Sequence, residues 1–153
     1  MRTIKILLTA MIISLGFLMC SVYAHEDIEA QWEKNVKQLG PHDEFVTSQP
    51  GDTRTGVVYF ANRPLKDFRI LSLKPESFDD KLVFWAKTLY TKEVLNPGRP
   101  LLVKLCLYGS IPNNGFSYTD SKGKIHYYAI NSSGKDGSLI LIDKIIVKET
   151  PVQ

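Results

Sequence analysis

A chain of 153 residues with 19 basic and 16 acidic side chains has room for one domain and a formal net charge of only +3. Its basic residues form no cluster or stripe along the sequence, so nothing favours a nucleic acid or an anionic membrane as the partner. It also lacks the motifs of a serine nucleophile elbow, a phosphate-binding loop or a zinc site. We therefore expect a binding protein rather than an enzyme, with no cofactor.

The first 24 residues have the pattern of a secretory signal peptide. Arg2 and Lys5 precede an apolar run that is shorter than the roughly 20 residues needed by a membrane-spanning helix. Val22 and Ala24 stand where a signal peptidase reads small side chains. We therefore expect residues 1–24 to be removed and the protein to be exported to the periplasm or the extracellular space, with no stable membrane insertion.

Cleavage after Ala24 would leave one globular domain, residues 25–153, with a net charge of +1, because two basic and no acidic residues are lost. It would also remove Cys20 and leave Cys106 without a partner for an intramolecular disulfide. Alternatively, Cys20 itself becomes a lipid-modified N-terminus, although Met19 precedes it where such a signal has a small residue. Cys106 is expected to be buried, as free cysteines commonly are.

Residues 25–39 are predicted to form an amphipathic helix. Their apolar side chains recur at spacings of four, four and three residues, which places them on one helical stripe: Ile28, Trp32, Val36 and Leu39. Acidic residues at the start and lysines near the end match the helix dipole, and Gly40-Pro41 stops the helix. Residues 40–54 are expected to form a connecting loop.

From Thr55 onward, β-branched and aromatic runs alternate with turn residues such as Lys74-Pro75-Glu76. This pattern predicts seven strands, at residues 55–61, 67–73, 81–90, 101–108, 115–120, 125–131 and 138–148. No helical crossover lies between them, so we expect a mainly β fold: an antiparallel β-sandwich of about seven strands with the N-terminal helix packed against it. The last run is apolar on both faces, which favours a central strand.

The stretch from Gly115 to Asn131 predicts a β-hairpin. Asp120 and Gly123 are typical of a type I turn closed by a glycine bulge. The turn sets a register in which four side chains share one face, in two opposed pairs: Tyr118 with His126, and Phe116 with Tyr128. We take these four residues as the candidate binding site.

Two interpretations of this aromatic patch compete. In the first, which we prefer, Phe116 and Tyr128 belong to the core, and Tyr118 and His126 lie at its edge. In the second, the patch is an exposed platform that stacks a sugar or anchors a protein partner. The two interpretations differ in whether another part of the chain covers this face.

The histidines and the cysteine suggest two further alternatives. An N-terminal His25 would offer its α-amino group and imidazole to copper, with His42 and His126 as the other imidazoles of the chain. Cys106 and His126 could instead act as nucleophile and base, but a thiol inside an apolar strand is expected to be inert. We therefore predict no metal site and no catalytic residue.

The favoured function is that of an exported binding protein for a protein or peptide partner, such as an inhibitor, an immunity factor or an envelope accessory protein. A carbohydrate-binding module is the alternative, in which Tyr118, Tyr128 or Trp85 would provide the stacking planes. A copper-binding protein that uses His25 is the second alternative. Fold class alone does not decide among them.

Overall fold

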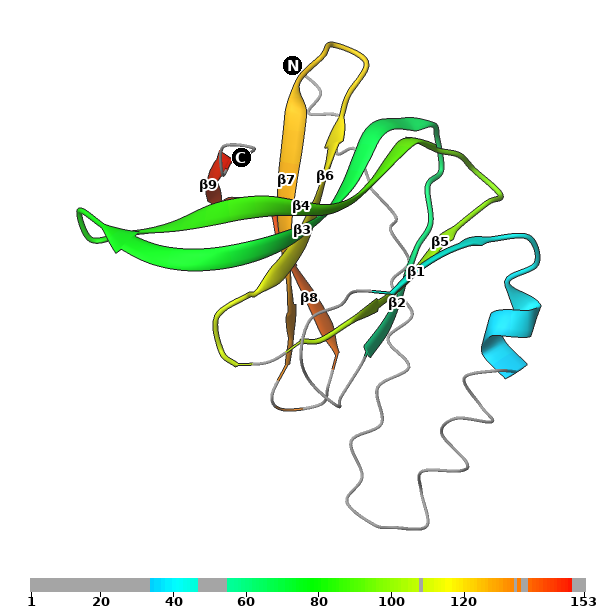
Figure 1. Cartoon of the computed structure of the whole chain (residues 1–153), viewed down its shortest axis with the longest axis horizontal. Helices are drawn as coiled ribbons and strands as arrows, with labels where there is room; N and C mark the ends of the chain where they lie inside the picture. Colours follow the sequence, from blue (N-terminus) through cyan, green and yellow to red (C-terminus); the bar gives the residue numbers. More distant parts are fainter. Residues whose placement is uncertain (1–33, 47–54, 108, 134, 136–137, 150–153) are drawn as a thin grey trace, which may run out of the picture.

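The computed structural model describes residues 34–46, 55–107, 109–133, 135 and 138–149. These residues form nine strands in two sheets, with one short helical segment at residues 34–38 (Figure 1). The predicted mainly β, sandwich-like class with one helix is thus confirmed. The helical segment agrees with the end of the helix predicted at 25–39, whose earlier part lies outside the described residues. No helix in the described residues is long and apolar enough to cross a membrane.

The smaller sheet has three strands in the order β1-β5-β2. Its central strand, β5 (Leu101–Leu105), runs parallel to β1 (Asp43–Val46) and antiparallel to β2 (Thr55–Tyr59). Strand β1 lies where the sequence predicted a loop, residues 40–54. It is only four residues long and alternates between half-buried and exposed side chains, which is too short a pattern to separate from a loop.

The larger sheet has six strands in the order β8-β7-β6-β3-β4-β9. Neighbouring strands are antiparallel except for the edge pair β4 and β9, which is parallel. The strands are β3 (Leu65–Phe78), β4 (Lys81–Leu95), β6 (Asn114–Thr119), β7 (Ile125–Ser132), β8 (Leu139–Ile142) and β9 (Ile146–Glu149).

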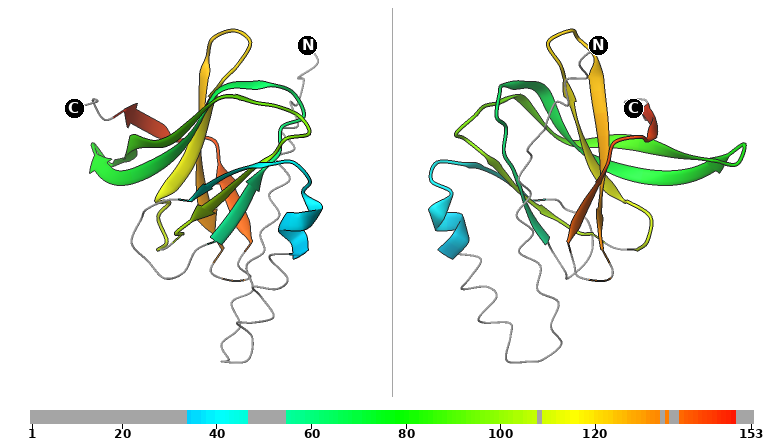
Figure 2. Two further views of the ribbon diagram at one scale, coloured as in Figure 1. Left: turned by 45° about the vertical axis from the view of Figure 1, so that its right-hand side comes forward. Right: turned by 180° about the vertical axis from the view of Figure 1, so that it is seen from behind.

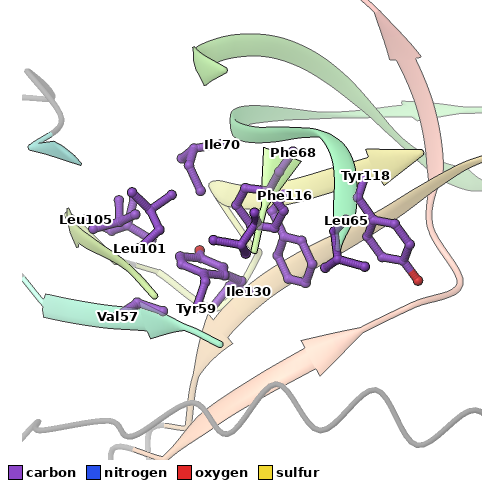
Figure 3. Close-up of a cluster of buried hydrophobic side chains, with 12 residues drawn as sticks. Val57, Tyr59, Leu65, Phe68, Ile70, Leu101, Leu105, Phe116, Tyr118 and Ile130 are labelled. Atoms are coloured by element: carbon purple, nitrogen blue, oxygen red, sulfur yellow. The ribbon is translucent and has the colours of Figure 1, made fainter. Parts of the chain in front are cut away.

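The main core lies between the two sheets, on what we call the inner face of the larger sheet (Figure 3). The ring of Tyr59 in β2 makes edge-on contacts with Phe68 in β3 and Phe116 in β6, with ring centroids 5.3 Å apart in both pairs. Each large side chain buried here contributes about 1.5–3 kcal/mol to folding. The other buried members are Val57, Leu65, Ile70, Leu95, Leu101, Val103, Leu105, Tyr118 and Ile130.

A second, smaller core covers the opposite, outer face of the larger sheet. Ile142, Ile145 and Val147 pack there against buried residues of β3, β4 and β7. The prediction of one central strand at 138–148 was wrong, because this segment forms β8 and β9 on opposite edges of the sheet. Its two-sided apolar pattern arises because the chain crosses the outer face between these edges and buries side chains against it.

Strands β3 and β4 form a long hairpin that extends past the smaller sheet (Figures 1 and 2). The predicted break at Lys74-Pro75-Glu76 was wrong: Pro75 lies inside β3, opposite Phe84. Strand β3 pairs with β6 only as far as Ser72, so Pro75 occupies an unpaired sheet edge, where proline is tolerated. The hairpin closes at Asp79 and Asp80, which both have positive φ, 48° and 57°, as in a type I′ turn.

Candidate functional site

The β6–β7 hairpin has the register that its turn residues predict. Tyr118 lies opposite His126, and Phe116 lies opposite Tyr128. The turn is stabilised by Asp120, whose Oδ1 accepts hydrogen bonds from the backbone N–H groups of residues 122 and 124, at 2.8 and 2.9 Å. Local turn chemistry therefore brings the four predicted binding residues onto one face.

The four rings form a stacked row on the inner face of the larger sheet. Ring centroids lie 4.9 Å apart for Phe116 and Tyr128, 6.1 Å for Tyr118 and Tyr128, and 5.1 Å for Tyr118 and His126. Phe116 and Tyr118 are buried in the main core (Figure 3), whereas Tyr128 and His126 are half-buried. Burial, together with a hydrogen bond to Tyr118, raises the pKa of Tyr128. Phe116 and Tyr118 thus present no open plane to a ligand.

His126 is engaged by the turn. Its Nε2 lies 2.8 Å from Oδ2 of Asp120. This contact, followed by the backbone N–H of Lys124, lowers the pKa of Asp120 to about 2, so the carboxylate is ionised at neutral pH. A shallow pocket of about 180 Å³ opens beside the turn, between residues 63–66 and residues 118–121. Its one carboxylate, Asp120, already has partners for both oxygens.

Neither of the two chemistry-bearing alternatives is assembled among the described residues. Cys106 is buried, and no hydrogen bond joins its thiol to His126. The imidazole of His42 bonds the carbonyl of Gly40 at 2.8 Å, and His25 lies outside the described residues. Within the described part of the chain, no three His, Cys, Asp or Glu side chains are grouped so that they could hold a metal ion.

The outer part of the β3–β4 hairpin, residues 74–87, offers a second candidate site; we call it the arm. Both faces of the arm near its tip are open to solvent, because residues 74–82 are all exposed. Phe78 is 60% exposed and Leu82 is 42% exposed, and Ile146 of the adjacent strand β9 is 49% exposed. Large apolar side chains that neighbouring strands expose to solvent commonly mark an interaction site.

Strand pairing determines which side chains share a face of the arm. Lys74 lies opposite Trp85, Phe78 lies opposite Lys81, and Lys148 of β9 lies beside Trp85. Because opposed residues and residues two apart point to the same side of a sheet, these side chains all extend the inner face of the larger sheet. We call this surface, which also includes Glu76, Lys87 and Ile146, the arm face.

The aromatic side chains of the arm face are held by polar neighbours. Lys148 places its Nζ 5.0 Å from the ring centroid of Phe78 and 5.4 Å from that of Trp85, which allows cation–π attraction to both rings. The indole N–H of Trp85 donates a hydrogen bond to the carboxylate of Glu76. Trp85, which the carbohydrate-binding alternative proposed as a stacking plane, is half-buried under these contacts.

The strand that carries Lys148 is attached to the outer face by its neighbour Glu149. Oε1 of Glu149 accepts a hydrogen bond from Arg69 of β3 at 3.1 Å and another from the hydroxyl of Tyr127 of β7 at 2.7 Å. Partial burial and the bond to Glu149 raise the pKa of Tyr127 to about 12. These contacts link β9 to two other strands and thereby position Lys148 over the arm rings.

Sequence reasoning did not find the arm, because it took Pro75 as the end of a strand. One available signal was the pair Asp79-Asp80 between two β-rich runs, since two-residue loops of this kind close hairpins. Comparisons with protein-family models, curated proteins and solved structures give no match for this chain.

Proposed function

We propose that the protein is a non-enzymatic binding protein that engages a protein or peptide partner through the arm. The observation that carries the proposal is the exposure of Phe78 and Leu82 on a hairpin that extends past the smaller sheet, together with that of Ile146 on the adjacent strand β9. Exposed aromatic side chains of this kind serve as anchors that fill pockets on a partner. The signal-peptide pattern of residues 1–24 supports export to the periplasm or the extracellular space.

Among binding functions, the arm best suits an inhibitor or immunity factor. Its type I′ turn has a twist that matches that of the flanking strands. Strands β3 and β4 pair through 13 residue pairs, and within the arm the register is unbroken from Lys74–Trp85 to Phe78–Lys81. A hairpin of this kind can enter the cleft of another protein with little loss of conformational freedom. Such preorganisation favours affinity.

Affinity capture from the organism's own extracytoplasmic extract tests the proposal. The immobilised protein should retain a specific protein that is lost with Phe78→Ser. The matched control is Ile140→Ser, since Ile140 in β8 is also exposed, at 46%, and lies off the arm. A protein retained by the wild type and by Ile140→Ser but not by Phe78→Ser supports the proposal. Equal retention by all three would overturn it.

A carbohydrate-binding module is the second candidate, because Phe78 and Trp85 place two rings on one face of the arm. Pull-down with insoluble polysaccharides separates the two functions. Retention of the protein on a polysaccharide, abolished by Phe78→Ser and unchanged by Ile140→Ser, would favour the glycan. If none of the polysaccharides tested retains the wild-type protein, the carbohydrate-binding function is excluded for them and protein binding remains as the proposed function.

A further inference from the structure

We propose that the arm face recognises an acidic protein surface with an apolar centre. This inference rests on the proposed function, because it specifies the partner of the same arm. Four lysines from three strands converge on the arm face, although they are dispersed along the sequence: Lys74 in β3, Lys81 and Lys87 in β4, and Lys148 in β9. Glu76 is the one carboxylate on this face in the described residues, and it is bonded to Trp85.

Among the described residues, no ion pair neutralises the positive charge of these lysines. All four side chains are exposed. No ion pair joins any of them to a carboxylate in the described part of the chain, where the ion pairs involve other residues. Lys148 lies over the rings of Phe78 and Trp85. The arm face is therefore a local surplus of positive charge on a chain whose formal net charge is only +3, and electrostatic complementarity favours an acidic partner.

Other features of the arm favour a protein over other anionic partners. Phe78 and Ile146 place apolar surface among the lysines, which matches the mixed character of protein interfaces. Trp85 lies under Lys148 and bonds Glu76, so its ring is not open to a nucleic-acid base. Asp79 and Asp80 form the tip of the hairpin, where they would repel an anionic membrane that the arm approached end-on.

The edges of the arm disfavour docking by strand addition. On the side away from β4, the last backbone hydrogen bond of β3 in the described residues joins the N–H of Leu73 to the carbonyl of Asn113. Further along this edge, Pro75 has no N–H to donate to another strand. Lys74 and Glu76, on either side of it, are charged. Proline and charged residues are the usual means of blocking an edge against further strands. The edge of β4 is occupied by β9 from Val83 to Ala86. The partner therefore docks on the face of the arm.

A fluorescence titration tests this inference with a defined probe. The chain has two tryptophans, so a Trp32→Phe background leaves Trp85 as the only indole and its emission reports on the arm face. The probe is a random copolymer of glutamate and tyrosine, which is acidic and aromatic. We expect saturable binding that weakens as salt rises and that falls roughly tenfold in the triple variant Lys74→Gln/Lys81→Gln/Lys87→Gln.

The control is a triple variant with the same loss of charge away from the arm, Lys122→Gln/Lys124→Gln/Lys144→Gln, whose three lysines are also exposed. Binding within twofold of the wild type in this control supports a local site. No binding of the copolymer, or an equal loss in both triple variants, would overturn the inference. So would tighter binding of heparin, single-stranded DNA or phosphatidylglycerol vesicles at the same salt concentration, which would assign the lysines to that ligand.

The same variants in the capture experiment distinguish this inference from the proposed function. Capture that is lost in Phe78→Ser and weakened in the arm lysine variant supports both. Capture that is lost in Phe78→Ser and unchanged in the lysine variant leaves a protein-binding arm and overturns its acidic partner. Capture that is unchanged in both variants overturns both proposals.

Discussion

Lys92 in β4 forms an ion pair with Asp43 in β1 and thereby links the larger sheet to the smaller one. Asp43 also accepts hydrogen bonds from Arg99 at 2.8 and 3.0 Å. The bonds from Arg99 and Lys92 lower the pKa of Asp43 below its ordinary value of 3.8. Asp43 therefore adds charged contacts between the two sheets to the apolar packing of the core.

We expect Asp43→Asn to reduce the free energy of unfolding by about 1–2 kcal/mol, because the neutral amide weakens three charged hydrogen bonds in a half-buried position. Urea unfolding measures the loss. Because the folded-state pKa of Asp43 is lowered, its contribution is present above the unfolded value near 3.8 and is lost as the pH falls through the folded value. The difference between wild type and variant should therefore shrink below about pH 4.

The matched control is Glu44→Gln in the same strand, since Glu44 is more exposed and pairs with Lys104 at a longer distance, 3.4 Å. This variant should change the free energy of unfolding by less than about 0.5 kcal/mol. A loss as large as that of Asp43→Asn would mean that charge in β1, rather than the specific bridge between the sheets, stabilises the protein.

Asp120 should titrate near pH 2, because His126 and two backbone N–H groups stabilise its ionised form. The chemical shift of its carboxyl carbon, followed by NMR as pH is lowered, measures the midpoint directly. In His126→Gln the midpoint should rise toward the ordinary value of 3.8. An Asp120 midpoint near 3.8 in the wild type would contradict the contact between Asp120 and His126.

The same lowered pKa makes the hairpin turn sensitive to acid. The stability that the ionised form of Asp120 confers is present above pH 3.8 and is lost as the pH falls toward 2. Amide exchange at Lys122 and Lys124, whose backbone N–H groups donate to Asp120, should accelerate over this range. In Asp120→Asn, the exchange rates should not show this transition.

Gly115 allows β6 and β7 to pack closely against β3. A Cβ atom added there would lie 2.3 Å from the backbone oxygen of Tyr128 and 2.9 Å from Cδ1 of Leu73. We expect Gly115→Ala to lower the free energy of unfolding by about 1–3 kcal/mol, because a backbone atom of the neighbouring strand must move. Urea unfolding measures the change.

The control for Gly115→Ala is Gly98→Ala, at a position with open space around the added atom but a φ of +77°. There the cost should be about 1 kcal/mol and should reflect backbone strain alone. A cost at Gly115 no greater than the cost at Gly98 would show that the close approach of β6 to its neighbours is not maintained in solution.

Glu149→Gln should weaken the attachment of β9 to β3 and β7 and thereby shift Lys148, although Glu149 itself is not part of the arm face. Partial burial is the largest cause that raises the pKa of Tyr127 to about 12, and the bond and charge of Glu149 add to it. The variant should therefore lower the Tyr127 midpoint part of the way toward 10. NMR of the tyrosine ring carbon measures this shift. Trp85 emission should change as well, because Lys148 lies over its ring. An unchanged Tyr127 midpoint would contradict the contact between Tyr127 and Glu149.

The β6–β7 hairpin is a part of the fold whose strand register can be predicted from neighbouring residues alone. Asp120 and Gly123 determine the turn, and the turn determines which residues stand opposite each other, so the pairing of Tyr118 with His126 could be predicted in advance. Pro75 shows where such reasoning fails. A proline ends a central strand but not an edge strand, and whether β3 has a neighbouring strand near Pro75 depends on where β6 begins.

The sequence by itself determined the mainly β class, most strand positions and the register of one hairpin, because turn chemistry and side-chain alternation act over a few residues. Only the tertiary structure decided which faces are covered. Tyr59 of the smaller sheet packs against Phe116, whereas Phe78 is 60% exposed. The tertiary structure also decided where charge gathers: Lys148 joins Lys74 because β9 pairs beside β4. Such convergence depends on contacts between strands far apart in the chain, which no local pattern encodes.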